Sequence, residues 1–586
     1  MHKTLALAAV ALGLALSRHS TAQGIAPPPA PAAATTRGAQ MPFTTYEAEA
    51  PTCRVRGQRV AMGGLPRADD STPAMEASGR AFVELAHTGD FVEFPAARAA
   101  NALVLRHCTP DAPGGGGTTS TLSVYVNGKK RQTLALSSRH NWLYGEAGQN
   151  GQSNDPAKGQ PHVFWDETRF FIQGGLRSGD TLRLQQDADN TAAFYRLDLV
   201  DLESVPPPLA PPPANTYLSV EAYGANGRDQ QDDTVAIQQC LKAAHAQHKI
   251  AWFPPGTYYQ SQKFVLDGGK VRGAGMWHTA LVGTTEGSDW SGTIGFDLRG
   301  ESPQVSDLMV DSQAHTARTE GGKPFTGAPD HWRIENVWIT HTIIGVWLNG
   351  SNGIIRNCRV RDTYADSINL NINAHDNLVE NNHVRGGGDD GIALLSEAEF
   401  KQPPAARNVV RHNTVSAIWW GHNCDVAGGS HHLIEDNLFE DNAKMGVFTL
   451  NLPGAFPMHP LTDTLIRRNT LLRGGGNYVW QKRGALWIFP DNAPVSNITF
   501  EDNDILDSVF RAVHFAGPKP QTITLRHNRI AGVGEDAIYF DTESSGVATL
   551  QDNTVSGVPP TGKPLVNASK GGLEVVQKGN SWQTPA

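Results

Sequence analysis

The sequence feature that most constrains the fold is a short pattern that returns throughout the second half of the chain. Each copy has an apolar residue, two intervening positions and an asparagine, and a short apolar run follows it. Successive copies are 24 to 34 residues apart, which fits one coil of a solenoid per copy, with loops in the longer coils. We expect the amides to form a ladder that satisfies backbone groups at a turn, and we assign them no catalytic role. The eight copies end at Asn357, Asn382, Asn413, Asn437, Asn469, Asn503, Asn528 and Asn553.

A tripeptide pattern, in which a small residue and then Ile or Val follow a variable residue, recurs in the same region. Asp366 and Asp390 fill the variable position in consecutive copies 24 residues apart, and Asp389 directly precedes Asp390. Because neighbouring strands of a solenoid lie about 4.8 Å apart, we expect Asp366 and Asp390 to stack on each other. The copies are Ile344–Val346, Asp366–Ile368, Asp390–Ile392, Met445–Val447, Arg511–Val513 and Asp536–Ile538.

Three neighbouring carboxyl groups suit the hydrolysis of a glycosidic bond. Their repulsion raises at least one pKa, so that one group stays protonated beside others that are ionised. The reaction needs a protonated acid for the leaving oxygen and a carboxylate that activates water or attacks. The alternative is that each aspartate only caps a turn, which is the role we expect of Asp536. Strand alternation would send Asp389 and Asp390 to opposite faces, whereas a turn formed by the glycines 386–388 could direct both to one groove.

Composition narrows the substrate and the location. The charged fraction is 18%, the net charge is −9, and no basic patch is present, so a neutral polymer is favoured over nucleic acid or a polyanion. Residues 1–22 combine Lys3, an apolar run and a small-residue cleavage site, which predicts a cleavable signal peptide and a secreted or periplasmic protein. No later stretch is apolar enough to cross a bilayer.

Two proline-rich stretches divide the remaining chain, and at 586 residues two or more domains are expected. A Pro/Ala-rich spacer occupies residues 23–42, and short alternating strands in residues 43–205 predict a β-sandwich. A Pro-rich linker follows in residues 206–215, and residues 216–586 contain the solenoid. The sequence therefore predicts an all-β protein, which we expect to be a monomer.

Five cysteines are an odd number for an exported protein, so at least one thiol should be free. Cys53 and Cys108 lie in the same predicted domain and could pair. Cys240, Cys358 and Cys424 are interpreted as buried apolar residues. No cysteine spacing indicates a zinc site or a thiol nucleophile.

The predicted sandwich opens with Tyr46-Glu-Ala-Glu49 and has Asp198 in its last strand. This arrangement resembles the jelly-roll carbohydrate-binding modules of families 6 and 35. The resemblance implies a structural calcium ion held by Glu47, Glu49 and Asp198; the alternative is that these are polar residues on a solvated strand face. Three aromatic residues of this region could contact sugar or belong to the core: Trp142, Tyr144 and Trp165.

The start of the solenoid region, in residues 220–229, 232–240 and 252–258, resembles the opening of pectate-lyase-like and polygalacturonase-like right-handed parallel β-helices. In these folds an amphipathic helix closes the open end of the solenoid core. The pair Asp232–Asp233 precedes the helical pattern and is interpreted as its N-cap rather than as a catalytic pair. The expected fold is therefore a right-handed parallel β-helix preceded by an N-terminal β-sandwich.

The chain contains an aspartate in Ala365-Asp-Ser-Ile-Asn369 and a Gly-Asp-Asp-Gly motif 23 residues later. Together with the β-helix opening and the N-terminal sandwich, these motifs resemble glycoside hydrolase family 87. That family contains α-1,3-glucanases and mycodextranases, and the resemblance covers nearly the whole mature chain. It implies an endo-acting, inverting hydrolase of α-1,3-glucan or nigeran, with no cofactor for catalysis. Asp389 would be the acid, and Asp366 and Asp390 would activate the water.

Other functions remain open. Neither the Gly-His-Gly nor the Arg-Ile-Lys motif of polygalacturonases follows the aspartate pair, which disfavours galacturonate, and a pectate-lyase mechanism is also disfavoured. A dextranase on the same scaffold is one alternative, and a non-catalytic β-helix that only binds polysaccharide is another. Aromatic residues after the acidic cluster could stack on sugar rings or serve as packing: Trp419, Trp420, Tyr478, Trp480 and Trp487.

Overall fold

The computed structural model describes residues 37–63, 72–145, 153–159, 161–284, 293–314, 322–442, 444–478 and 481–583. The predicted signal peptide and most of the predicted spacer lie outside these residues. Within the described ranges, no helix is long and apolar enough to cross a membrane. Strands dominate, and the described helical segments are α1 (Pro73–Glu76), α2 (Thr234–Ala246), η1 (Ser78–Arg80), η2 (Pro156–Lys158), η3 (Val220–Tyr223) and η4 (Ala398–Phe400).

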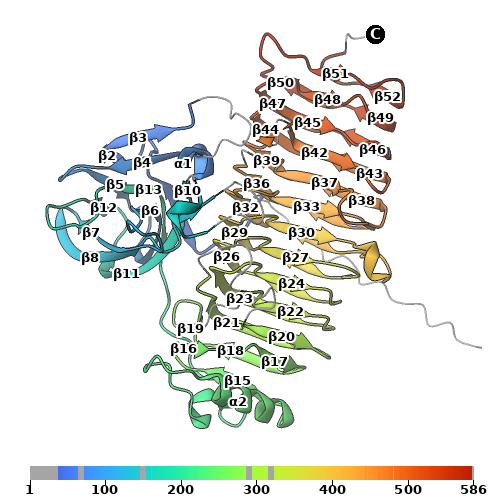
Figure 1. Ribbon diagram of the computed structural model, residues 1–586. Helices are drawn as coiled ribbons and strands as arrows, with labels where there is room; N and C mark the ends of the chain where they lie inside the picture. Colours follow the sequence, from blue (N-terminus) through green and yellow to red (C-terminus); the bar gives the residue numbers. More distant parts are fainter. Residues whose placement is uncertain are drawn as a thin grey trace, which may run out of the picture. The chain divides into compact units, whose positions relative to one another are not determined.

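The N-terminal part of the described chain is a β-sandwich of two antiparallel sheets, as predicted (Figure 1). Apolar side chains of both sheets form one core. The first sheet contains β1 (Phe43–Glu47), β3 (Gln58–Ala61), β4 (Ala81–Leu85), β6 (Ala100–Cys108), β11 (Asp166–Leu176) and β13 (Tyr195–Glu203). The second contains β2 (Arg54–Arg56), β5 (Phe91–Pro95), β7 (Thr119–Val126), β8 (Lys129–Ser137) and β12 (Thr181–Gln185), and a separate hairpin pairs β9 (Trp142–Tyr144) with β10 (Pro161–Val163).

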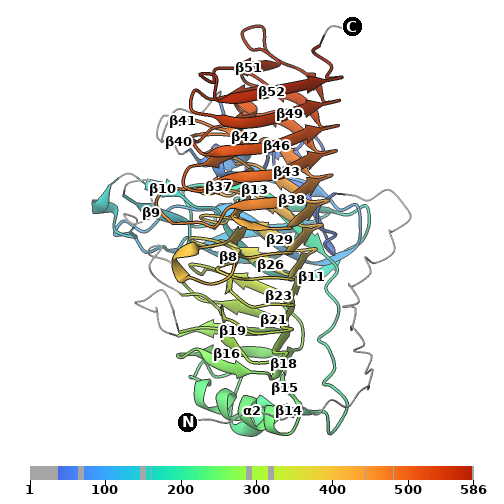
Figure 2. The same ribbon diagram turned by 90° about the vertical axis from the view of Figure 1, so that its right-hand side faces the viewer.

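The rest of the chain is a right-handed parallel β-helix, in which successive coils lie on one another (Figures 1 and 2). One parallel sheet, here called the outer sheet, has 12 strands: β17 (Phe264–Asp267), β20 (Phe296–Arg299), β22 (Phe325–Gly327), β24 (Val346–Leu348), β27 (Ile368–Leu370), β30 (Ile392–Leu395), β33 (Cys424–Ala427), β37 (Phe448–Leu452), β42 (Gly484–Pro490), β45 (Arg511–Phe515), β48 (Ile538–Phe540) and β51 (Leu565–Asn567).

A 25-stranded sheet supplies the remaining sides of the coils. Its strands are β14 (Tyr217–Ser219), β15 (Ile250–Phe253), β16 (Gly256–Gln260), β18 (Lys270–Gly273), β19 (Thr279–Gly283), β21 (Gln304–Asp311), β23 (Arg333–Thr340), β25 (Ile354–Arg356), β26 (Arg359–Arg361), β28 (Leu378–Glu380), β29 (His383–Arg385), β31 (Val409–Arg411), β32 (Thr414–Ser416), β34 (Gly429–Ser430), β35 (Leu433–Glu435), β36 (Leu438–Glu440), β38 (Leu461–Arg467), β39 (Thr470–Leu472), β43 (Val495–Glu501), β44 (Asp504–Ser508), β46 (Pro520–Arg526), β47 (Arg529–Val533), β49 (Ser545–Gln551), β50 (Thr554–Ser556) and β52 (Leu573–Lys578). A small hairpin, β40 (Asn477–Tyr478) with β41 (Gln481–Lys482), lies outside it.

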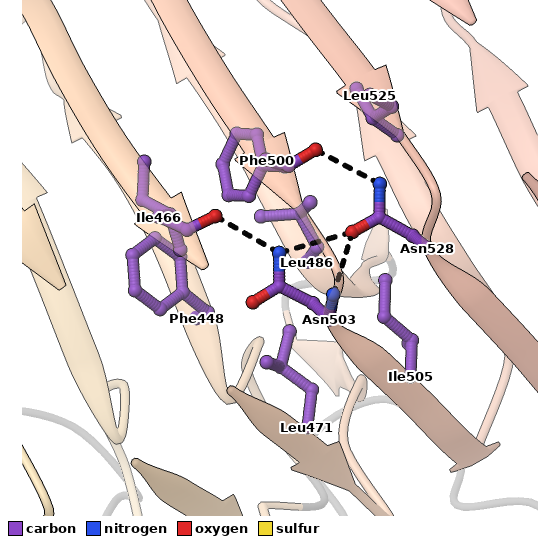
Figure 3. A pocket seen from close by; sticks show the side chains of 9 residues that line it. All are labelled: Phe448, Ile466, Leu471, Leu486, Phe500, Asn503, Ile505, Leu525 and Asn528. Carbon is purple, nitrogen blue, oxygen red and sulfur yellow. Dashed lines mark hydrogen bonds between the residues drawn. The ribbon is translucent and has the colours of Figure 1, made fainter. Parts of the chain in front are cut away.

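The predicted asparagine ladder is present inside the β-helix. Each amide oxygen accepts both the backbone N–H and the side-chain N–H of the preceding ladder residue, as Asn528 does for Asn503 at 3.0 Å (Figure 3). The amide nitrogen of Asn503 also donates to the carbonyl of Ile466. Buried backbone groups at the turn are thereby satisfied, as they must be where water is excluded. The ladder runs through Asn382, Asn413, Asn437, Asn469, Asn503, Asn528, Asn553 and Asn580.

The prediction was wrong at the first rung of this ladder. Cys358, and not Asn357, donates its backbone N–H to the Asn382 oxygen. Asn357 instead has a positive φ of 55° and its side chain accepts from Asn381. In this coil the ladder position is therefore Cys358, one residue after the predicted Asn357.

The tripeptide pattern also needs one correction. The strand register pairs Phe448 with Cys424 on one side and with Leu486 on the other. The copy in this coil is therefore Gly446-Val447-Phe448, one residue later than the predicted Met445–Val447. The variable position of this coil holds a glycine.

The helix α2 packs at the start of the β-helix, where the capping helix was expected. Asp233 occupies its N-cap position but makes no side-chain capping bond. The backbone N–H of Thr234 donates to the Asp232 carboxylate at 3.0 Å. The Asp233 carboxylate accepts hydrogen bonds from the backbone N–H groups of Asn226 and Tyr259. The pair is thus structural, and Asp233 joins the helix to the first coil.

All five cysteines are buried and free, so Cys53 and Cys108 do not pair. Burial raises the pKa of the Cys53 thiol to about 11 and that of Cys108 to about 12. Cys240, Cys358 and Cys424 belong to the core of the β-helix, as predicted.

Buried ion pairs join the sandwich to the β-helix. Three arginines that point outward from β26 and β29 contact carboxylates of β11 and β13, and their side chains are at most 5% exposed. The pairs are Arg359 with Glu203, Arg361 with Glu167, and Arg385 with both Glu167 and Asp201. The sandwich therefore covers the charged outer face of these two coils.

Candidate active site

The structure brings Asp366, Asp389 and Asp390 together at the start of two neighbouring strands of the outer sheet. Asp366 lies two residues before β27 and Asp390 two residues before β30, and the register pairs Ile368 with Ile392. One carboxyl oxygen of each aspartate lies within 4.8 Å of one from each of the others. The stacking expected from the repeat is therefore observed.

A bend before β30 places both adjacent aspartates in this cluster. Gly388 and Asp389 both donate their N–H groups to the carbonyl of Ala365, at 3.2 and 3.1 Å. Gly386 has a φ of +74°, and a Cβ on Gly388 would come within 2.3 Å of the Tyr364 backbone. Both Gly386 and Gly388 thus occupy positions that require glycine, which marks a bend in the chain. Side chains alternate between faces only in extended backbone, so Asp389 and Asp390 need not point to opposite faces.

Hydrogen bonds fix the orientation of two of the carboxylates. Asp366 accepts from the Asn369 amide at 2.6 Å and from the backbone N–H of Asp390 at 3.2 Å. Asp390 accepts from the backbone N–H of His422 at 3.0 Å, and the Nδ1 atom of the same imidazole lies 2.9 Å from that oxygen. Asp366 and Asp390 are buried, whereas Asp389 is half-buried.

His422 was not predicted from the sequence. Burial lowers the pKa of this imidazole to about 3, so the ring is neutral, and with its proton on Nδ1 it donates to Asp390. The strand register pairs Ile392 with Cys424, so His422 occupies the same variable position as Asp390, one coil later. The Gly391 N–H donates to the His422 carbonyl, in agreement with this register. The tripeptide pattern did not find it because Asn423 and Cys424 replace the small residue and the Ile or Val.

Asp425 was missed as well. It lies on β33, in the outward-facing row of the outer sheet, directly beside Ala393 of β30. Its carboxyl, that of Asp390 and the ring of His422 have ligand atoms within 4.8 Å of one another. Burial, reinforced by the charge of Asp390, raises the pKa of Asp425 well above its usual value. This raised pKa favours the protonated form of Asp425, and the backbone N–H of Asn451 donates to its carboxyl at 3.3 Å.

Aromatic side chains and the sandwich form a wall beside the cluster. Trp419 packs against Tyr364, and both contact Phe164, which follows the β9–β10 hairpin. Trp419, Trp420 and Trp487 are each at most 9% exposed, so these rings are mainly packing residues. Tyr478 is partly buried beside Trp420, and the predicted Trp480 lies outside the described residues.

Two regions of the chain match protein-family models. Residues 40–205 match the α-1,3-glucanase catalytic domain D1, and residues 230–540 match the α-1,3-glucanase catalytic domain D2. The chain belongs to the α-1,3-glucanase family. It is therefore a glycoside hydrolase that acts on α-1,3-glucan, and the two matched regions coincide with the sandwich and with most of the β-helix.

Solved structures of the family share this fold. The Agl-KA catalytic domain aligns with a TM-score of 0.83 at 25% identity, over 92% of this chain and 98% of that chain. The catalytic unit of the glycoside hydrolase family 87 α-1,3-glucanase from Streptomyces thermodiastaticus strain HF3-3 aligns at 0.78 and 26%, over 93% and 98%. A family 87 α-1,3-glucanase catalytic domain in complex with nigerose aligns at 0.75 and 23%, over 93% and 100%. No curated protein sequence matches the chain.

The three carboxylates proposed to bind metal lie together in the sandwich of this α-1,3-glucanase. One oxygen each of Glu47, Glu49 and Asp198 is buried and has no hydrogen-bond partner among the described residues. Burial and repulsion from neighbouring carboxylates raise the pKa of Glu49 to about 7 and that of Glu47 well above its usual value. Burial raises the pKa of Asp198 to about 6, although Arg106 opposes this effect. Such a set of orphaned, repelling oxygens suits a hard cation.

Other contacts in this cluster limit the fit to a cation. Arg106 donates to one Asp198 oxygen, and the Ser78 hydroxyl donates to Glu47 at 2.8 Å. Within the described part of the chain, four groups of His, Cys, Asp or Glu have ligand atoms all within 4.8 Å, and this set is not among them. The chemistry of the site fits calcium, but the carboxylates must move closer together to bind it.

The three sandwich aromatics differ in exposure. Trp165 and Tyr144 are buried and donate to the Pro73 carbonyl and to Asp111. Trp142 is partly buried and donates to the Thr109 carbonyl. These contacts assign Trp165 and Tyr144 to packing.

The neutral state of Asp425 leads to a test by substitution. Asp425→Asn keeps the shape and the zero charge, so we expect α-1,3-glucan hydrolysis within about threefold of the parent, because a neutral group replaces a neutral group. Asp425→Ala leaves the Asn451 N–H without its partner, which costs about 1–3 kcal/mol, and should lower both activity and thermal stability. Initial rates and melting temperatures of both variants are the measurement. A loss in Asp425→Asn as large as that in Asp390→Asn would show that Asp425 acts as an anion.

Proposed function

We propose that this α-1,3-glucanase cleaves internal α-1,3-glucosidic bonds with Asp389 as the general acid and with Asp366 and Asp390 as the groups that activate water. The observation that supports this proposal is the convergence of the three carboxyl groups within 4.8 Å at the start of two neighbouring strands of the outer sheet. Glycoside hydrolysis needs such a set, in which one group donates a proton and another removes one.

The hydrogen bonds of two of the carboxylates support this division of roles. Donors to a carboxylate stabilise its ionised form, and Asp366 and Asp390 both accept hydrogen bonds from amide or backbone N–H groups. Asp389 lies in the bend, is less buried than the other two and has two anionic neighbours. A proton shared among the three is therefore best placed on Asp389, next to the leaving oxygen.

We propose inversion of the anomeric centre, with the attacking water held by Asp366 and Asp390. The shortest separations between carboxyl oxygens, within 4.8 Å, are smaller than the roughly 6.5–9.5 Å between acid and base that is usual for inverting enzymes. This spacing favours a second candidate mechanism, retention through a covalent intermediate. Proton NMR of the first product separates the two: β-anomeric reducing ends from the α-linked substrate indicate inversion, and α-anomeric ends indicate retention.

The proposed substrate is α-1,3-glucan or the mixed-linkage glucan nigeran, and export through the signal peptide is part of the proposal. Solved family members are described in complex with nigerose and with tetrasaccharides. The direct test incubates the mature protein with α-1,3-glucan, nigeran, dextran, starch and polygalacturonate and measures new reducing ends. A dextranase would cleave dextran first, and a binding protein would cleave none of these polymers.

We also propose that Glu47, Glu49 and Asp198 hold a structural calcium ion, which would stabilise the sandwich by neutralising their charges. Ligand binding to the folded state alone stabilises it by about 2.7 kcal/mol at 100 times Kd. We therefore expect 1 mM CaCl2 to raise the melting temperature relative to EGTA, and Glu49→Gln to abolish the increase. MgCl2 is the control, since magnesium prefers smaller, octahedral sites. An equal melting temperature in calcium and EGTA would contradict the proposal.

A further inference from the structure

A cavity lies beyond the C-terminal ends of the outer-sheet strands β22, β24 and β27, whereas the catalytic aspartates lie at the strand starts. Its volume is about 460 Å³, and its lining includes Asn349, Asn373, His375, Phe400 and Gln402. Asp366 precedes β27, whereas Asn373 follows the end of the same strand, at Leu370. The cavity is thus separated from the acidic cluster by the length of the strand.

A fixed loop builds one wall of this cavity. The chain leaves β30 at Leu395, forms the short turn η4 and returns at Ala405. The Ser396 hydroxyl accepts the Ala405 N–H at 2.9 Å, and Ala398 donates to the Pro457 carbonyl at 2.8 Å. These bonds hold the base of the loop, so that Phe400 is presented at its tip with 49% of its surface exposed.

The polar groups of the cavity suit a neutral, hydroxyl-rich ligand. The side-chain amides of Asn349 and Asn373 make no hydrogen bond within the described residues, so each offers a donor and an acceptor. The Asp330 carboxylate at the base already accepts from Ser351 at 2.8 Å and from Asn352 at 2.7 Å. Among the residues that the structure describes, no lysine or arginine lines the cavity, which disfavours an anionic ligand.

We propose that this cavity is an accessory binding site for a short stretch of glucosyl residues, in which one sugar face lies on Phe400 and the hydroxyls bond to Asn349 and Asn373. An exposed aromatic ring beside free amides provides the combination of apolar and polar contacts that small-ligand sites use, and the volume is within their usual range of about 300–1,000 Å³. This inference rests on the proposed function, because it assigns the same glucan to both sites. The accessory site would hold the polymer near the catalytic aspartates without taking part in bond cleavage.

The test uses Phe400→Ala and Asn373→Ala, separately and combined, in the full protein. Phe400 is exposed and η4 is held through backbone and Ser396 contacts, so we expect all variants to fold. Phe171→Ala is the matched control, since Phe171 is 48% exposed but lies on the sandwich strand β11. Binding to particulate α-1,3-glucan is measured by sedimentation, and hydrolysis of soluble nigerotetraose is measured in parallel.

We expect Phe400→Ala to weaken binding to the particles about tenfold, since loss of an aromatic contact costs roughly one factor of ten. Hydrolysis of nigerotetraose should stay within about twofold of the parent, because catalytic residues are untouched. Unchanged particle binding in the double variant would overturn the accessory site. A parallel loss of nigerotetraose hydrolysis would also overturn it, because the cavity would then be part of the catalytic groove. Failure of the unmodified protein to cleave either substrate would instead refute the proposed function.

Discussion

Asp389→Asn is expected to lower the rate of α-1,3-glucan hydrolysis by about 10²–10⁴-fold, the usual contribution of a general acid. The amide has the size of the carboxyl but cannot protonate the leaving oxygen. Affinity for the glucan should be retained, since the variant loses an interaction made in the transition state rather than in the ground state. Reducing-end assays on the polymer and binding of nigerotetraose by calorimetry measure the two effects.

Asp536→Asn is the matched control for this experiment. Asp536 has the same position in the tripeptide pattern but lies near the C-terminal end of the β-helix, where its carboxylate accepts the Lys563 N–H at 2.9 Å. Its amide variant should keep full activity. Equal activity of Asp389→Asn and the parent would show that another residue donates the proton, whereas loss of binding together with rate would indicate a folding defect.

Glu167→Ala is expected to destabilise the protein by about 3–5 kcal/mol, the cost of removing one member of a buried ion pair. Glu167 is 1% exposed at its side chain and lies between Arg361 and Arg385, 2.8 Å from the Arg361 Nε atom. Arg385 keeps Asp201 as a partner, but Arg361 loses its carboxylate in a site closed to water. Urea unfolding followed by tryptophan fluorescence measures the change.

Glu84→Ala provides the comparison for an exposed pair. Glu84 is bonded to Arg196 at 2.8 Å, with side chains 24% and 20% exposed, so we expect a change of no more than about 1 kcal/mol. A similar effect for both variants would contradict the role of the buried pairs in joining the sandwich to the β-helix.

The same contact predicts how stability depends on pH. The guanidinium groups of Arg385 and Arg361 outweigh the effect of burial and lower the pKa of Glu167 to about 2. A carboxylate with a lowered pKa binds protons less tightly in the folded state than in the unfolded state. Its contribution is therefore complete above the unfolded pKa of about 4.3 and is lost as the pH falls toward 2. Urea midpoints between pH 6 and pH 3 should decline less in Glu167→Ala than in the parent.

The solenoid could be predicted because its signals are periodic. The asparagine positions and the tripeptide pattern repeat with the coils, so that seven of the eight predicted ladder residues, from Asn382 to Asn553, are confirmed. The same repeat predicted the stacking of Asp366 and Asp390. Asn357 and the Met445 copy were each displaced by one residue, because the pattern does not specify where a turn ends.

The remainder of the site depends on contacts that have no periodic signal. Asp425 lies in the outward-facing row of β33. An aspartate at one such position does not indicate which side chains lie beside it in the neighbouring coils. Arg361 and Glu167 are separated by 194 residues, and alternating charged residues on a strand are equally typical of a solvated face. The sequence resemblance to a separate binding module likewise gave no sign that the sandwich is joined to the β-helix through buried charges.

The asparagine ladder has a consequence for how such enzymes diversify. The ladder bond between neighbouring coils is about 3.0 Å whether the intervening chain has 24 residues, as between Asn413 and Asn437, or 34, as between Asn469 and Asn503. Ten additional residues are therefore accommodated entirely outside the core. Natural variation can lengthen or shorten the loops that carry Phe400 or border the aspartates while the interior keeps its spacing, so that the recognition of different glucans can change independently of folding.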